Sequence, residues 1–157
     1  MNQLSFEDFL ETVPNKDVAF VTSLHEELMK QGCTYECKLA KSGYTLTYYT
    51  PTCHRALATY IFRKTGMKLR MYPQHLHQYE AYLDDLPDKM KKEIKKASVC
   101  KRLIDPSTCN QKCVMGYDFY MDQEHYQKCR YMAFQPNLSE ENDPYIMMIL
   151  KKELSCR

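Results

Sequence analysis

The 157-residue chain contains only four glycines, and this scarcity argues against several kinds of site. Loops that cradle phosphate groups need closely spaced glycines, so phosphate loops and dinucleotide-binding fingerprints are nearly excluded. No run of 18 apolar residues occurs, and we therefore predict no membrane-spanning helix and no membrane partner. The N-terminal stretch MNQLSFEDFLETV lacks a basic region followed by an apolar one, so it does not predict a signal peptide and favours a cytoplasmic location.

Neither charge nor catalytic motifs single out a reaction. The 22 basic and 20 acidic residues leave a formal net charge of +2, which is too small to indicate a polyanionic partner. No two of the five histidines have a convincing metal-ligand spacing, and no Gly-x-Ser-x-Gly nucleophile motif is present. We therefore expect a binding or structural role rather than an enzyme, and no residue is selected as catalytic.

The first half of the chain predicts a helix followed by an antiparallel meander. Val18, Val21, Leu24 and Leu28 recur at helical spacing, and Gly32 follows where a left-handed residue is favoured. Alternating residues, with glycines at two of the turns, then predict strands at 33–39, 44–50, 56–63 and 67–72. On the last strand we expect the methionines and leucine at 67, 69 and 71 to face the core.

The second half predicts further helices and a pair of strands. Helices are expected at about 75–85 and from Pro87 to about 98, and strands at 117–121 and 126–134, joined by an acidic turn at 122–124. Asp143-Pro144 is typical of a helix start, and the expected apolar stripe of the final helix is Ile146, Ile149, Leu150 and Leu154.

Together these elements predict an α+β two-layer sandwich, with an antiparallel sheet flanked by helices and an irregular cysteine-rich segment. The chain length indicates a single domain over residues 1–157. Its expected parts are the helix and meander at about 1–73, helices at about 75–98, and the cysteine-rich segment, two strands and final helix at about 99–157.

Four of the eight cysteines are clustered in the second half of the chain. They are Cys100, Cys109, Cys113 and Cys129, with the spacing Cys-x8-Cys-x3-Cys-x15-Cys. A reducing cytoplasm keeps such thiols free, and four of them can form one tetrahedral thiolate site for zinc. If residues 107–112 are helical, Cys109 and Cys113 share a face and lie about 5–6 Å apart at Cβ. This cluster predicts a structural zinc site.

Other interpretations of the cluster stay open. The four cysteines are consistent with plain burial and no ligand, because free cysteine is often a core residue. An iron–sulfur cluster is a further alternative, less favoured than zinc, and so is a redox pair formed by Cys109 and Cys113. Basic residues on both sides of Cys100, and beside Cys129, favour thiolates and would offset the charge of a four-thiolate site.

The other cysteines give weaker signals. Cys33 and Cys37 would lie about 13 Å apart on a strand, so they cannot share a metal and are expected to be core residues. Cys53 and His54 are adjacent in a predicted turn, and such a pair is usually incidental. Cys156 is expected to be exposed and without a role.

A basic and aromatic sheet face is an alternative binding site. Arg63, Lys68, Arg70 and Tyr72 are expected to share the face of the meander that points away from the core. Cations beside an aromatic ring suit a planar small molecule or single-stranded nucleic acid. The sequence pI of about 8.0 disfavours nucleic acid, so we consider a small-molecule ligand.

The run VCKRLIDPSTCNQKCVMGYDF, followed by HYQKCRY, resembles a family of small uncharacterised cytosolic proteins from anaerobic Gram-positive bacteria. These proteins carry a cysteine-rich C-terminal region and have no assigned activity. The earlier part, with FRKTGMKLRMYP and LPDKMKKEIKKA, resembles families that have a helix-flanked antiparallel sheet and lack the cysteines. The resemblance therefore implies a fold class and candidate cysteines, but no reaction.

Overall fold

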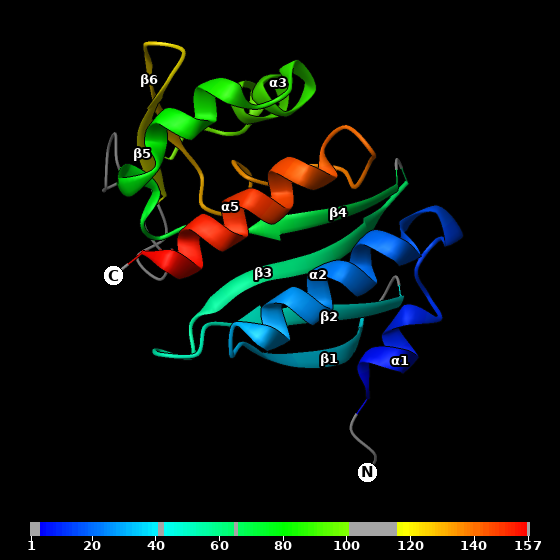
Figure 1. Ribbon diagram of the computed structural model, residues 1–157. Coiled ribbons are helices and arrows are strands. Elements are labelled where there is room, and N and C mark those ends of the chain that lie inside the picture. Colours follow the sequence, from blue (N-terminus) through cyan, green and yellow to red (C-terminus); the bar gives the residue numbers. More distant parts are fainter. Residues whose placement is uncertain (1–3, 41–42, 65, 101–115, 157) are drawn as a thin grey trace.

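A computed structural model describes residues 4–40, 43–64, 66–100 and 116–156 (Figure 1). The described chain has an α+β fold, with a four-stranded antiparallel sheet and a separate two-stranded hairpin. Its α-helices are α1 (Phe6–Leu10), α2 (Val18–Lys30), α3 (Asp88–Lys96) and α5 (Asp143–Ser155). Its 3-10 helices are η1 (Asn15–Asp17), η2 (Leu76–Gln78) and η3 (Glu80–Asp85). Its strands are β1 (Thr34–Ala40), β2 (Gly43–Tyr49), β3 (Ala56–Arg63), β4 (Gly66–Met71), β5 (Tyr117–Met121) and β6 (Glu124–Lys128).

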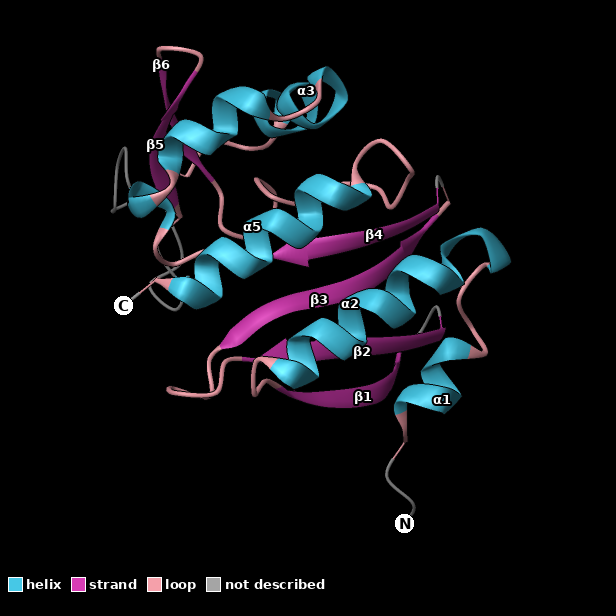
Figure 2. Cartoon of the chain, in the orientation of Figure 1, coloured by secondary structure: helices cyan, strands magenta, loops and turns pink. Residues whose placement is uncertain are grey.

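The main sheet is an antiparallel meander in the order β1-β2-β3-β4, as the sequence predicts (Figure 2). Tyr60 of β3 is paired with Leu69 of β4, and both side chains are fully buried. Met67 and Met71 lie on the same side as Leu69 and are also buried, because side chains alternate along a strand. This face of the sheet forms the floor of the core.

Helices α2 and α5 run in the same direction across one face of the sheet (Figure 1). Val21, Leu24 and Leu28 of α2 are buried, and their spacing of three and four places them on one side of the helix. The two helices are linked at the surface by Glu27 and Lys151, whose charged atoms lie 4.0 Å apart. No described helix has both the length and the apolar character needed to cross a membrane.

The free edge of β4 is covered by an extended segment that the sequence does not signal. The amide groups of Leu69 and Met71 donate to the carbonyl oxygens of Pro136 and Phe134, at 3.1 and 2.8 Å. The amide of Leu138 donates to the carbonyl of Met67 at 2.9 Å. Residues 134–138 therefore satisfy backbone groups that an exposed edge strand would leave unpaired.

Three predicted elements need correction. Residues 75–85 form the two 3-10 helices η2 and η3 rather than one α-helix. The second strand of the hairpin is Glu124–Lys128, shorter than the predicted 126–134, and residues 130–134 turn back toward the main sheet. The hairpin turn contains only Asp122 and Gln123, both with positive φ, as expected for a two-residue turn that matches the strand twist.

Candidate functional site

The structure places Cys100 and Cys129 on either side of one short antiparallel pairing. The amide of Cys100 donates to the carbonyl of Gln127 at 2.9 Å, and the amide of Cys129 donates to the carbonyl of Ser98 at 2.8 Å. The bridge between them joins Val99 and Lys128. Cys100 lies opposite Gln127, and Cys129 is two residues further along on the same face. Cys100 and Cys129 are therefore diagonal neighbours, and such positions are about 7–8 Å apart. Cys129 directly follows β6 rather than lying in the middle of a strand.

Gly116 is in close contact with Cys100. Its amide donates to Sγ of Cys100 at 3.2 Å. A Cβ atom at position 116 would overlap the carbonyl oxygen of Lys128 and lie 2.9 Å from Sγ of Cys100. Only glycine fits this position without displacing the backbone. A backbone amide that donates to a cysteine sulfur stabilises negative charge on that sulfur, as it does around metal-bound thiolates.

The other two predicted ligands, Cys109 and Cys113, lie outside the described residues. Among the residues that the structure does describe, no group of three or more histidine, cysteine or acidic side chains is placed to hold a metal ion. Cys33 and Cys37 are buried core residues, as predicted, and burial raises the pKa of the Cys33 thiol to about 11.

Two of the cations expected to neutralise the cysteine cluster have other partners. The ammonium group of Lys128 donates to the carbonyl oxygens of Lys95 and Ala97, at 2.7 and 2.9 Å, and so caps the C-terminal end of α3. The guanidinium of Arg130 lies over the rings of Tyr72 and Tyr117. These side chains stabilise the packing of the hairpin against its neighbours.

The predicted basic and aromatic face is largely engaged by the protein itself. Lys68 lies 3.5 Å from Glu93 of α3, and Arg70 donates to the side chain of Gln135 at 2.9 Å. Tyr72, expected to point into solvent, is buried beneath Arg130 and beside the ring of Tyr131. Arg63 is exposed and donates to a neighbouring backbone carbonyl. The segment after β6 thus covers part of this face, which reduces the surface offered to a ligand.

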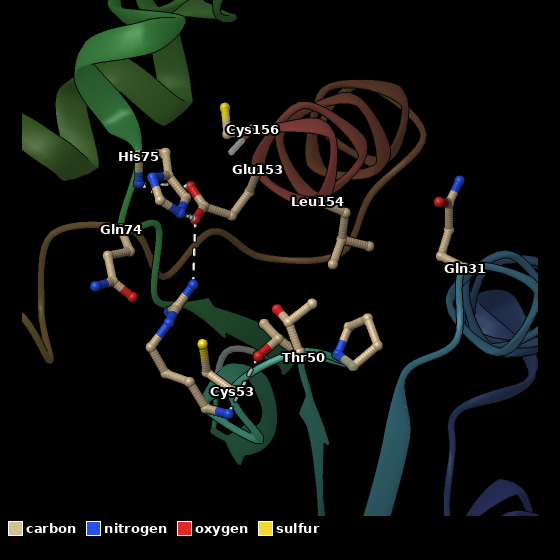
Figure 3. Close-up of a pocket in the computed structure, with 11 residues that line it drawn as sticks. Gln31, Thr50, Cys53, Gln74, His75, Glu153, Leu154 and Cys156 are labelled. Carbon is tan, nitrogen blue, oxygen red and sulfur yellow. Dashed lines mark hydrogen bonds and ion pairs between the residues drawn. The ribbon is translucent and has the colours of Figure 1, made fainter.

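A pocket that sequence reasoning missed lies where α2 and α5 end (Figure 3). Its volume is about 300 Å³, and the loop between β2 and β3 forms one wall. The lining includes Gln31, Thr50, Cys53, Arg55, His75 and Glu153. Both helices present their C-terminal ends here, and the partial negative charge of those ends disfavours anionic ligands.

Glu153 is the most connected residue of this pocket, and its side chain is only 1% exposed. The carboxylate accepts hydrogen bonds from the backbone amide of His75, at 3.0 and 3.2 Å, and from the hydroxyl of Tyr79 at 2.8 Å. It also accepts from Arg55 at 3.2 Å, and Arg55 donates in turn to the carbonyl of Tyr72 at 3.0 Å. The network joins α5 to β3 and to the chain that follows β4.

Burial is the main electrostatic influence on this network. It raises the pKa of Tyr79 well above its ordinary value, and the adjacent Glu153 carboxylate adds to the effect. Burial also raises the pKa of the Cys156 thiol. Tyr79 therefore acts as a neutral hydrogen-bond donor, which suits the positioning of a carboxylate.

The sequence contains one signal for this network. In α5 the buried positions are Ile146, Ile149, Leu150 and Glu153, so the carboxylate occupies the buried stripe where Leu154 was expected. A glutamate on the apolar stripe of a helix requires a buried partner. Arg55 and Tyr79 carry no comparable signal, because nothing local places them beside α5.

A scan against protein-family models, a search of curated proteins and a search of solved structures each found no match for this chain. The likeness of the cysteine-rich region to proteins of anaerobic Gram-positive bacteria therefore stays a prediction.

Proposed function

We propose that the protein is a metal-binding protein in which Cys100, Cys109, Cys113 and Cys129 hold a structural zinc ion. The observation that carries the proposal is the backbone pairing of Cys100 with the chain around Cys129, which makes these two cysteines diagonal neighbours. The hydrogen bond from the Gly116 amide to Sγ of Cys100 gives further support, because backbone amides donate to cysteine sulfur in the same way around metal-bound cysteines. A reducing cytoplasm would keep all four thiols available, and the proposal includes this location.

Four thiolates leave no open coordination position, so the site would stabilise the fold rather than catalyse a reaction. The ion would tie the chain on both sides of residues 101–115 to the hairpin formed by β5 and β6. Structural zinc contributes on the order of 10 kcal/mol in small zinc domains, a large amount beside the usual stability of a protein.

The first test is elemental analysis of tag-free protein purified without oxygen, with an absorption spectrum recorded on the same sample. We expect about one zinc per chain and no visible absorbance, since zinc has a filled d shell. Iron together with visible absorbance would show that the site holds an iron–sulfur cluster instead of zinc. Protein free of metal would overturn the proposal.

Cysteine variants test which residues hold the ion. We expect Cys100→Ser, Cys109→Ser, Cys113→Ser and Cys129→Ser each to lower the zinc content and the melting temperature. Cys53→Ser is the matched control, because Cys53 is exposed and belongs to no predicted ligand set. A chelator should destabilise the wild type and Cys53→Ser alike, and should have little effect on Cys100→Ser. Equal zinc content in all five variants would contradict the assignment.

A further inference from the structure

The two edges of the main sheet differ in how the fold covers them. The strand order leaves β1 and β4 at the edges. The edge of β4 is covered by residues 134–138, whereas β1 is paired only with β2. Within the described part of the chain, the backbone of Thr34–Ala40 forms no hydrogen bond outside that ladder. Figure 1 shows β1 as the outermost strand, so every second residue of this seven-residue strand presents its N–H and C=O groups outward.

Helix α1 lies over the middle of the sheet rather than beside this edge. The ring of Phe9 packs against Tyr60 and Phe62 of β3, with centroids 5.3 and 6.1 Å apart. The amide of Phe6 donates to the hydroxyl of Tyr35 at 3.1 Å, which is a contact with a side chain of β1 and not with its backbone. As far as the structure describes the chain, the outer edge of β1 is therefore available to another strand.

Leu39 of β1 is an apolar residue that the fold leaves in solvent. It is 74% exposed, the highest value among the large hydrophobic residues that the structure describes. It shares one side of the strand with Cys37, which is only 6% exposed, because side chains alternate along a strand. Leu39 thus lies on the core side of the sheet, beyond the point where the core ends. An uncovered aliphatic side chain beside an open strand edge favours association with another chain.

The other side of β1 restricts which strand can pair with it. Glu36 and Lys38 both lie on that side with their side chains in contact with solvent, and Oε1 of Glu36 is 3.2 Å from Nζ of Lys38. A lysine on an edge strand discourages unspecific pairing. A partner strand is favoured only where it sets a carboxylate opposite Lys38 and a cation opposite Glu36, since like charges in opposite positions are destabilising.

A second copy of β1 meets this requirement. When two copies pair in antiparallel fashion about a two-fold axis at Cys37, Glu36 of each copy lies opposite Lys38 of the other. Leu39 then lies opposite Tyr35 of the other copy, on the core side, where an aromatic ring can cover it. An axis at Glu36 or at Lys38 would instead set two like charges opposite each other. The charges therefore select one register.

We propose that the protein forms a symmetric homodimer in which two β1 strands pair edge to edge about Cys37 and join the two four-stranded sheets into one. Backbone hydrogen bonds hold the strands together, and the charged pairs and Leu39 fix the register. One strand pair buries less than a standard interface, so the dimer is weak and reversible. This inference does not depend on zinc, because no proposed zinc ligand lies in β1.

Sedimentation equilibrium of the full chain tests the proposal. A reducing agent is included, because the exposed Cys53 could otherwise cross-link two molecules. We expect the average mass to rise from one chain toward two as the concentration increases from about 10 µM to about 1 mM, the range of a weak complex. Protein that stays monomeric at about 1 mM would overturn the proposal and leave this edge to a different chain.

Charge reversal tests the register. We expect Glu36→Lys and Lys38→Glu each to weaken self-association about tenfold, because the symmetry places like charges opposite each other twice. The double variant Glu36→Lys/Lys38→Glu restores the opposite-charge pairs and should associate like the wild type. An equimolar mixture of the two single variants should form a mixed dimer more tightly than either variant associates alone. Failure of the double variant or of the mixture to recover association would refute the assignment.

Lysine substitution tests the part played by Leu39. Leu39→Lys removes the apolar contact and adds a charge to the edge strand, so it should weaken self-association about tenfold or more. Met148→Lys is the matched control, because Met148 is 40% exposed but lies on α5 rather than on β1. It should associate like the wild type, and unchanged melting temperatures show that both variants are folded. Equal association of the wild type and Leu39→Lys would overturn the proposal.

Discussion

Arg55 and Glu153 are 98 positions apart in the sequence, yet Nη2 of Arg55 lies 3.2 Å from Oε2 of Glu153. The carboxylate is almost fully buried, whereas the guanidinium is partly open to the pocket. The pair connects the start of β3 to the end of α5, and the hydroxyl of Tyr79 completes the link to the chain after β4. Several separate parts of the fold therefore depend on one buried carboxylate.

We predict that Glu153→Gln lowers the free energy of unfolding by about 3 kcal/mol, because it leaves the guanidinium of Arg55 without its counter-charge. Urea denaturation measures this value directly. Glu27→Gln is the matched control, since Glu27 pairs with Lys151 at the surface, where ion pairs contribute little to stability. Equal losses in the two variants would show that the Arg55–Glu153 pair does not stabilise the fold specially.

Gly116→Ala should be destabilising for a steric reason. The added Cβ would overlap the carbonyl of Lys128 and the sulfur of Cys100, and overpacking of this kind costs about 2 kcal/mol. Gly66→Ala is the contrasting variant, because Gly66 has positive φ and open space around it, so its cost is conformational. Only Gly116→Ala should increase the reaction rate of Cys100 with a thiol reagent. Unchanged reactivity would contradict the close packing at Gly116.

The thiols outside the cysteine cluster should differ strongly in alkylation rate. Burial keeps Cys33 away from reagents and raises its pKa to about 11, so little thiolate forms near pH 8. Cys53 is exposed and should react first. Mass-spectrometric mapping of the native protein during treatment with iodoacetamide follows both sites. Denatured protein is the control, in which the two cysteines should react at similar rates. Early labelling of Cys33 would contradict its place in the core.

Asp143 should make stability depend on pH. Burial raises its pKa from 3.8 to about 6, and the nearby carboxylates of Asp17 and Glu140 add to the shift. The folded protein therefore binds this proton more tightly than the unfolded chain. The loss of stability caused by ionisation of Asp143 is absent below about pH 4, develops as the pH rises, and is complete above about pH 6.

We therefore expect Asp143→Asn to gain stability relative to the wild type near pH 7 and to lose that gain near pH 4. The amide oxygen can still accept the hydrogen bond that the Ser139 amide donates to Asp143. Urea denaturation at both pH values measures the difference, and Asp85→Asn, at an exposed position, is the control. A difference between variant and wild type that stays constant with pH would refute the role of Asp143.

Local patterns in the sequence determined most of the secondary structure. The spacing of Val21, Leu24 and Leu28 places one side of α2 in the core, and the alternation of Met67, Leu69 and Met71 does the same for β4. Both patterns depend on the geometry of a single element, so they can be read without knowledge of the fold. The order of the four strands could also be predicted from the sequence, because short turns join neighbouring strands in an antiparallel meander.

Tertiary structure alone decided how the candidate sites are built. The requirement for glycine at position 116 arises from the approach of Cys100 and Lys128. The side-chain partners of Glu153 are Arg55, just before β3, and Tyr79, between η2 and η3, both far from α5 in the sequence. The cover of β4 by residues 134–138 also arises from long-range hydrogen bonds. Hydropathy patterns report which side of an element is buried, but not which distant groups meet there. For this reason the sequence determined the elements, and packing between them determined the pockets.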